Sequence, residues 1–173
     1  SLSRSDSMEK FIPEFKYAPV DFDPFAGKVI ERTVPSTEAQ REVFIASQMG
    51  TEASCAYNES VSLELTGRLD VPALEDALHR LVQRHEALRG CMSADGTRVI
   101  VHEHADIGLQ QRDLSALSPA QRQLELGRLA EKDMTTPFDL LNGPVFRASL
   151  IKSGPEEHQL RLTGHHVLVD GWS

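Results

Sequence analysis

The chain has 173 residues, enough for one domain with a hydrophobic core and too few for two comfortable ones. Its formal net charge of -8 argues against nucleic-acid binding, because phosphate contacts need a basic face. The sequence has neither an apolar run that approaches the roughly 20 residues of a membrane span nor the pattern of a signal peptide. Cys55 and Cys91 form neither a disulfide framework nor a zinc pattern, so we expect a reducing, cytoplasmic compartment.

Residues 1–34 differ in composition from the rest of the chain. They mix serines, prolines and scattered aromatic residues without a sustained period, which is typical of a linker or extended lead-in. We expect their aromatic side chains to lie against a neighbouring surface. A single folded unit is predicted over residues 35–173.

Two of the three predicted helices start with a capping box. Thr37 and Gln40 have this spacing at the first helix, and Ser118 and Gln121 have it at the third. The first helix is expected to end near Gly50, because glycine tolerates a left-handed cap.

Residues 68–90 carry the strongest helical pattern in the chain. Asp70 can cap the start and Gly90 can end the helix. Apolar or core-compatible residues recur there at the i, i+3, i+4, i+7 spacing of a core-facing helix: Leu74, Ala77, Leu78, Leu81, Val82, His85 and Leu88.

Four strands are predicted from alternation and turn signals. Residues 58–67 alternate apolar and polar side chains, and residues 97–103 make a shorter strand. Residues 145–151 and 158–169 are joined by a short polar connection, which favours an antiparallel hairpin. Helices and strands are therefore interspersed, and we predict an α/β (α+β) two-layer sandwich in which helices cover one mixed sheet.

The segment "LTGHHVLVDGWS", residues 162–173, contains two adjacent histidines. Successive side chains of a strand point to opposite faces, so His165 and His166 cannot reach the same cavity. If Leu160 and Leu162 face one side, His166 shares that side and His165 lies on the other. One histidine is therefore the candidate for chemistry, and the other is a candidate for support.

A neutral imidazole suits proton transfer near pH 7, since its unperturbed pKa is close to 6.5. Asp170 follows His166 by four residues and could orient a histidine or pair with an arginine, and Gly171 allows the chain to bend. Two other interpretations stay open: purely structural histidines, and a metal site of two histidines and a carboxylate. The sequence shows no phosphate-binding loop or nucleophile elbow, so direct transfer between two bound substrates is favoured.

Four ordered blocks resemble the condensation domains of nonribosomal peptide synthetases. "HHVLVDGWS" is similar to their HHxxxDG motif. "STEAQREVFIASQ", "RHEALRG" and "PFDLLNGPVFRASLI" are similar to three further motifs of the family, in the same order. The resemblance covers residues 35–173. Residues 38–60 resemble condensation domains that follow polyketide-type modules in hybrid assembly lines.

The resemblance implies a fold similar to chloramphenicol acetyltransferase, in which two lobes form a V around the active site. Residues 35–173 would be the N-terminal lobe, and a C-terminal lobe would complete the tunnel. The lobe alone is expected to be inactive. The implied reaction joins an upstream acyl or peptidyl thioester to the amine of a downstream aminoacyl thioester.

The same resemblance implies roles for the motif residues and for partners. His166 would deprotonate or position the attacking amine, His165 and Asp170 would be mainly architectural, and Gly171 would keep the loop near the reacting centre. No intrinsic cofactor or metal is implied, because the substrates hang from phosphopantetheine arms. Partners would be the upstream and downstream carrier domains, the C-terminal lobe, and adjacent adenylation or polyketide synthase domains, with no nucleic acid or membrane.

Other functions share parts of this pattern. An ester-forming acyltransferase of the same superfamily would share the His-x-x-x-Asp pattern, but the duplicated histidine and the Gly-Trp-Ser tail favour condensation. Epimerising relatives share the motif as well. Cyclising relatives have aspartate at the position of His165, which argues against them. The non-enzymatic alternative is a carrier-docking module in which both histidines are structural.

The block at residues 84–90 also has a purely structural interpretation. On a core-facing helix we expect His85 and Leu88 to pack in the interior. Arg84 or Arg89 would lie at the surface or in an ion pair.

Overall fold

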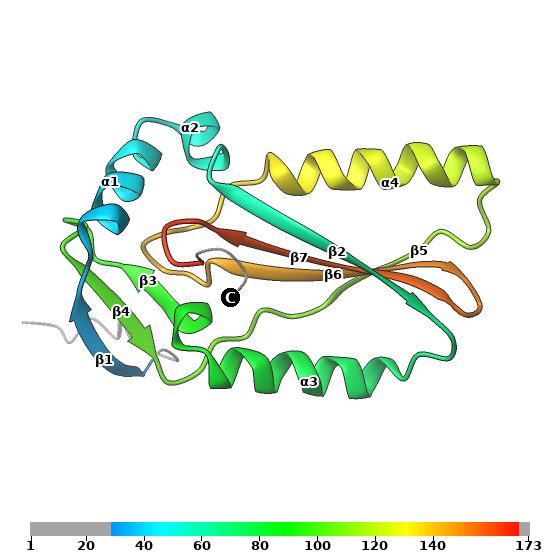
Figure 1. Cartoon of the computed structure of the whole chain (residues 1–173), viewed down its shortest axis with the longest axis horizontal. Coiled ribbons are helices and arrows are strands. Elements are labelled where there is room, and N and C mark those ends of the chain that lie inside the picture. Colours follow the sequence, from blue (N-terminus) through cyan, green and yellow to red (C-terminus); the bar gives the residue numbers. More distant parts are fainter. Residues whose placement is uncertain (1–28, 170–173) are drawn as a thin grey trace, which may run out of the picture.

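The computed structural model describes residues 29–169 and contains two β-sheets with helices around them (Figure 1). This is a mixed α/β fold, as predicted. Its elements in chain order are β1 (Ile30–Pro35), α1 (Glu38–Ser47), α2 (Thr51–Cys55), β2 (Asn58–Thr66), α3 (Val71–Arg84), the 3-10 helix η1 (Glu86–Arg89), β3 (Gly90–Met92), β4 (Arg98–His102), β5 (Gln110–Asp113), α4 (Pro119–Met134), β6 (Phe146–Gly154) and β7 (Glu157–His165). Among residues 29–169, none of the helices has the length and apolar character needed to cross a bilayer.

The main sheet has four strands in the order β2-β7-β6-β5. The predicted hairpin is confirmed: β6 and β7 pair antiparallel, with Leu150 opposite Leu160. On the other side of β7, strand β2 also runs antiparallel to it, whereas β5 pairs in parallel with β6 at the far edge. The sequence analysis did not predict β5, because its residues are all exposed and carry no apolar alternation.

A second, smaller sheet has the order β1-β4-β3 and is antiparallel throughout. Strand β4 was predicted, but β1 and β3 were not. β1 falls at the end of the segment that was expected to be a lead-in, and its side chains are mostly exposed, so its sequence shows no alternation. Residues 1–28, with the aromatic residues of that segment, lie outside the described part of the chain.

Both predicted capping boxes are present. The Thr37 hydroxyl accepts a hydrogen bond from the Gln40 backbone N–H at 3.1 Å, and the Gln40 side chain accepts one from the Thr37 backbone N–H at 2.9 Å. Ser118 and Gln121 repeat the arrangement at α4. The first helix ends at Ser47, slightly before the predicted position. Gly50 then adopts a φ of 148°, which favours glycine and starts the short, unpredicted helix α2.

The helix predicted over residues 68–90 is shorter than expected. α3 ends at Arg84, and His85 is extended, with φ -112° and ψ 108°, before the 3-10 helix η1. The break has a physical reason in Arg89, whose buried guanidinium donates to the Val82 carbonyl at 3.1 Å and to the His102 carbonyl at 2.6 Å. A continuous α-helix would keep the Val82 carbonyl in its own ladder.

Because α3 ends at Arg84, residues 84–90 do not share one buried helical face. His85 is exposed, so the prediction that it packs in the interior was wrong, whereas Leu88 is buried as predicted. Arg84 lies at the surface, and Arg89 forms an ion pair with Glu31, as expected for this pair of arginines.

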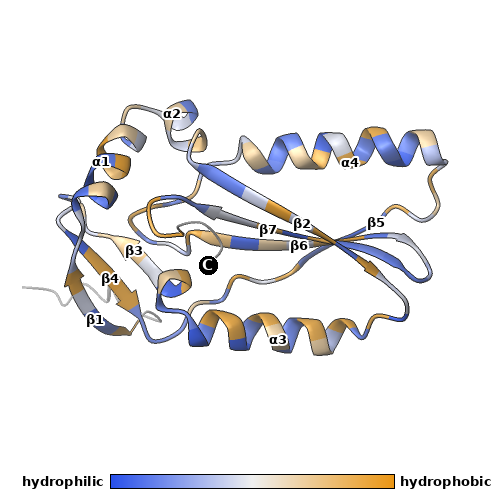
Figure 2. Ribbon diagram, in the orientation of Figure 1, coloured by the Kyte–Doolittle hydropathy of each residue, from blue (hydrophilic) through white to orange (hydrophobic). Residues whose placement is uncertain are grey.

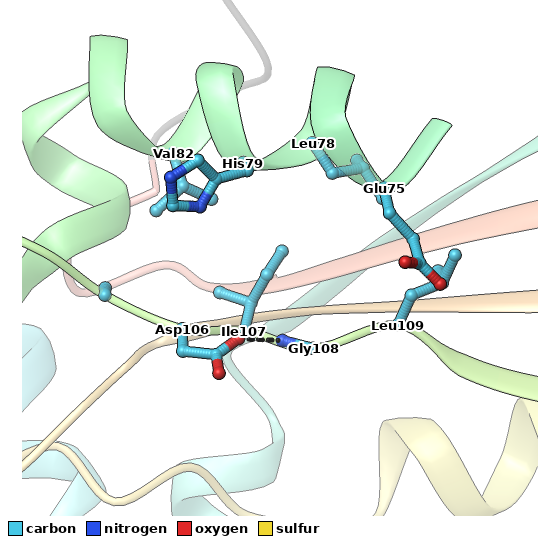
Figure 3. A pocket seen from close by; sticks show the side chains of 9 residues that line it. Glu75, Leu78, His79, Val82, Asp106, Ile107, Gly108 and Leu109 are labelled. Carbon is cyan, nitrogen blue, oxygen red and sulfur yellow. Dashed lines mark hydrogen bonds between the residues drawn. The ribbon is translucent and has the colours of Figure 1, made fainter. Parts of the chain in front are cut away.

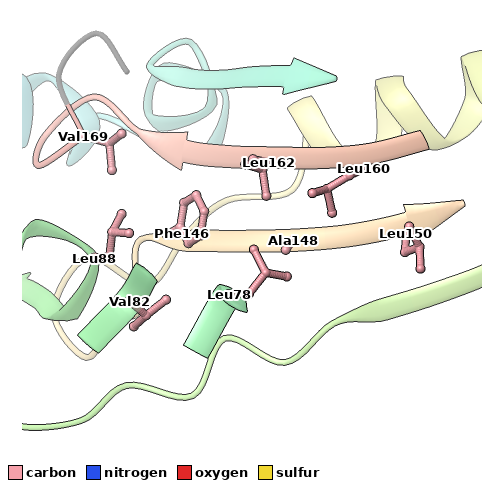
Figure 4. Close-up of a cluster of buried hydrophobic side chains, with 9 residues drawn as sticks. All are labelled: Leu78, Val82, Leu88, Phe146, Ala148, Leu150, Leu160, Leu162 and Val169. Atoms are coloured by element: carbon pink, nitrogen blue, oxygen red, sulfur yellow. The ribbon is translucent and has the colours of Figure 1, made fainter. Parts of the chain in front are cut away.

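One face of the main sheet packs against α3 through apolar side chains. Leu78 and Val82 of α3 lie against Phe146, Leu160 and Leu162 of the strands in one cluster (Figure 4). Figure 2 shows apolar residues interspersed with polar ones along α3, as expected for an amphipathic helix. Full burial of such a side chain contributes about 1.5–3 kcal/mol, so this cluster is the main apolar tie between α3 and the sheet.

The opposite face of the sheet is held to α4 by polar contacts, so helices cover both faces of the sheet. Asp133, in the last turn of α4, pairs with Arg147 on β6 and with Arg161 on β7, and also accepts a hydrogen bond from Thr163. Burial opposes ionisation of Asp133, but the hydrogen bonds from Thr163, Arg147 and Arg161 outweigh it and lower the pKa of the carboxyl. One carboxylate therefore ties two neighbouring strands to the helix.

We expect Asp133→Ala to lower the free energy of unfolding by about 3 kcal/mol, because it leaves two largely buried guanidinium groups without their carboxylate. Urea denaturation of the chain measures this loss. Asp76→Ala is the matched control, since its exposed pair with Arg80 within α3 contributes less than about 1 kcal/mol. Equal losses for the two variants would contradict the role of Asp133.

Candidate active site at the end of strand β7

Strand β7 ends at the first of the paired histidines, and the chain then turns back. The His165 carbonyl accepts hydrogen bonds from the backbone of Leu168 at 3.2 Å and of Val169 at 2.9 Å. The strand was predicted to continue to Val169, but these bonds form a turn instead. A Cβ at Gly164 would lie 2.9 Å from the Val169 side chain, so the turn can pack on the strand only because residue 164 is glycine.

His165 is completely buried, with 0% of its surface exposed. Its Nδ1 accepts a hydrogen bond from the Val167 backbone N–H at 3.1 Å, so the ring proton is on Nε2. Nε2 then donates to the Ser54 carbonyl at 3.1 Å and lies 3.2 Å from the Ser54 hydroxyl. The ring of Phe138 meets it edge-on at 6.3 Å. His165 therefore connects α2 to the end of β7.

Burial lowers the pKa of His165 to about 4, more than the hydrogen bond to the Ser54 carbonyl raises it, and the neighbouring His166 lowers it further. The ring is neutral at pH 7 and does not exchange protons with a substrate there. The unfolded chain takes up a proton near the ordinary value of 6.5, whereas the folded chain does so only near 4. Between these values the unfolded state binds more protons, so the histidine costs stability as the pH falls.

We expect the free energy of unfolding to decrease by about 3 kcal/mol between pH 6.5 and pH 4 through this group. His165→Asn removes the group, so the variant should lose most of that pH dependence even where its overall stability is lower. Urea denaturation at several pH values measures the slope. His104→Asn, at an exposed position, is the control that should retain it. A slope unchanged in His165→Asn would contradict the assignment.

His166 lies on the other side of the strand, as the alternation predicted. Its backbone N–H donates to the Tyr57 carbonyl at 2.9 Å, which joins it to the start of β2. The side chain is 36% exposed, and its Nδ1 lies 3.0 Å from Oε1 of Glu59. At this distance the carboxylate and the ring nitrogen are within the range of an ion pair. His166 is therefore the accessible histidine of the pair.

Glu59 and Ser54 are site residues that the sequence analysis missed. Ser54 gave no signal, because it contacts His165 mainly through a backbone carbonyl in a helix that was not predicted. Glu59 did give a signal in the sequence. It is a charged residue two positions before Val61, in the series of β2 that is otherwise apolar. Asp170 and Gly171 lie outside the described residues.

The alternative of a joint metal site does not fit this geometry. Both ring nitrogens of His165 already hold hydrogen bonds within the protein, and its ring lies on the opposite side from His166. Within residues 29–169, no group of three or more histidine, cysteine, aspartate or glutamate side chains is arranged to hold a metal ion.

A cavity of about 260 Å³ lies between α3 and the loop at residues 105–109 (Figure 3). Leu78 and Val82 line one wall, and Ile107 faces them from the loop. Asp106 accepts a hydrogen bond from the Gly108 backbone N–H at 2.9 Å, which shapes the loop. Neither histidine of the pair lines this cavity, so it brings no further group to them.

Comparison with known proteins decides the family. Residues 30–173 match the model of the condensation domain. The chain belongs to the condensation-domain family. Chondramide synthase cmdD of Chondromyces crocatus is 36% identical over 142 residues, which are 81% of this chain and 4% of the synthase. Tyrocidine synthase 3 of Brevibacillus parabrevis is 37% identical over 139 residues, which are 80% of this chain and 2% of that protein.

Solved condensation domains have the same fold. The starter condensation domain of rhizomide synthetase RzmA superposes with a TM-score of 0.70 and 26% identity, over 82% of this chain and 34% of that one. The EpoB cyclization-docking bidomain of Sorangium cellulosum gives a TM-score of 0.66 at 19% identity, which shows the fold alone. The condensation-domain chain corresponds to the N-terminal portion of such a domain and spans about a third of it.

Proposed function

We propose that this condensation-domain chain supplies the catalytic histidine, His166, of a domain that forms amide bonds between carrier-bound substrates. The observation that carries the proposal is the contrast within the pair. His165 is fully buried and neutral, whereas His166 is 36% exposed at the end of β7. Of the two rings, His166 is the one that a substrate could reach.

The reaction proposed for the complete domain needs one proton acceptor. The amine nitrogen of the downstream aminoacyl thioester attacks the carbonyl carbon of the upstream acyl or peptidyl thioester, and a C–N bond forms. The C–S bond breaks, and the sulfur leaves as the thiol of the phosphopantetheine arm. His166 takes the proton that the nitrogen loses and passes it on to the leaving sulfur, which completes the thiol and restores the neutral imidazole. Holding both thioesters close supplies much of the remaining rate.

The proposed partners follow from the same reaction. Upstream and downstream carrier domains present the two thioesters, and adenylation domains load amino acids on the carriers. The chain matches only 4% and 2% of the length of two large synthases, which supports a multidomain setting. The C-terminal lobe would close the active site over His166, which is consistent with the length of the solved condensation domains. A polyketide module upstream remains a prediction from the sequence.

We expect His166→Ala, in the full-length protein that contains this chain, to lower the rate of amide formation by about 10²–10³-fold, because the proton acceptor is lost. Single-turnover assays with both carriers loaded, read by mass spectrometry, measure the rate. The partly exposed ring contributes little to packing, so the melting temperature should stay near that of the wild type.

His79→Ala is the matched control, at an exposed position of α3, and should retain the wild-type rate. A rate for His166→Ala within about twofold of the wild-type rate would contradict a catalytic role for His166 and favour the carrier-docking function. Offering alcohol and amine acceptors to the same preparation separates ester formation from amide formation, and we expect the amine to be preferred.

A further inference from the structure

Glu59 is a charged residue in an otherwise apolar series. In β2 the side chains of Val61 and Leu65 pack on the face of the sheet that lies against α3, and Glu59 continues that series by parity. The side chain of Glu59 is 40% exposed, so its carboxylate is only partly withdrawn from water. Its Oε1 meets Nδ1 of His166 at 3.0 Å.

The pairing of β2 with β7 explains why the two side chains meet. Glu59 stands directly opposite Gly164, which has no side chain, and His166 follows two residues later on the same side. Diagonal neighbours of this kind are about 7–8 Å apart at their backbones, within reach of a long side chain. The Tyr57 carbonyl holds the backbone of His166 at 2.9 Å, so β2 and the residue before it hold His166 at two points.

The contact distinguishes the two ring nitrogens. Nδ1 is covered by protein, although 36% of the side chain is exposed, so the exposed surface belongs to the other atoms. A carboxylate oxygen close to a nitrogen lone pair is repelled, whereas the same oxygen beside an N–H is attracted. The neutral ring carries one proton, so a proton on Nδ1 places the lone pair on Nε2.

We propose that Glu59 is a positioning residue: it orients the His166 ring and keeps its proton on Nδ1, so that Nε2 accepts the proton of the attacking amine. This inference rests on the proposed function of His166. Carboxylates commonly orient catalytic or metal-binding histidines through the ring nitrogen that does not react. Here the carboxylate comes from the neighbouring strand, far from His166 in sequence and beside it in the sheet.

The test compares Glu59→Ala, Glu59→Gln and Glu64→Gln in the full-length protein, by single-turnover amide formation with both carriers loaded. Glu59→Ala should lower the rate about tenfold, in the range typical of groups that orient a functional histidine. Glu59→Gln keeps an oxygen at the same place and should recover part of the rate. Glu64→Gln removes the same charge from β2 at an exposed position, where the side chain pairs with Gln159, and should retain the wild-type rate.

The double variant Glu59→Ala with His166→Ala shows whether Glu59 acts through the histidine. We expect it to be no slower than His166→Ala alone, with carrier loading unchanged. A further loss in the double variant, or a wild-type rate for Glu59→Ala beside an inactive His166→Ala, would overturn the positioning role and leave the function of His166 standing. A wild-type rate for His166→Ala would instead overturn the proposed function itself.

Discussion

The site depends on the alternation of side chains at the end of one strand. Residues 165 and 166 have the same side-chain chemistry, but the pleat of β7 sends them to opposite faces. One ring lies in the interior between α2 and Phe138, with both nitrogens bonded. The other emerges where the strand turns. A shift of one residue in the pairing of β2 with β7 would exchange these two environments, so the register of the sheet determines which histidine is exposed.

Several parts of the structure keep that register in place. The apolar cluster fastens α3 to one face of the sheet, and Asp133 fastens α4 to the other through arginines on β6 and β7. At the strand end, Gly164 lets the turn pack at a distance that a side chain would prevent. Burial of apolar surface supplies most of the stability, whereas the polar contacts are directional and therefore decide how the strands align.

Local signals in the sequence predicted much of this arrangement, and long-range contacts account for what was missed. The capping boxes at Thr37 and Ser118, the hairpin and the separation of the two histidines all follow from spacing within a few residues. The end of α3 at Arg84 follows from the bonds of Arg89, whose partners include the carbonyl of His102 at the end of β4. The contact of Glu59 with His166 requires the pairing of β2 with β7, which alternation alone does not specify.

The two histidines also affect each other electrostatically. A proton on His166 disfavours one on His165, and burial disfavours it far more, so the pair holds at most one proton down to about pH 4. At neutral pH the interior ring therefore places no positive charge beside the exposed one, whose own charged neighbour is the carboxylate of Glu59. In the proposed function, a neutral His165 leaves His166 as the single imidazole that receives a proton. That arrangement suits a reaction in which one proton leaves the attacking amine.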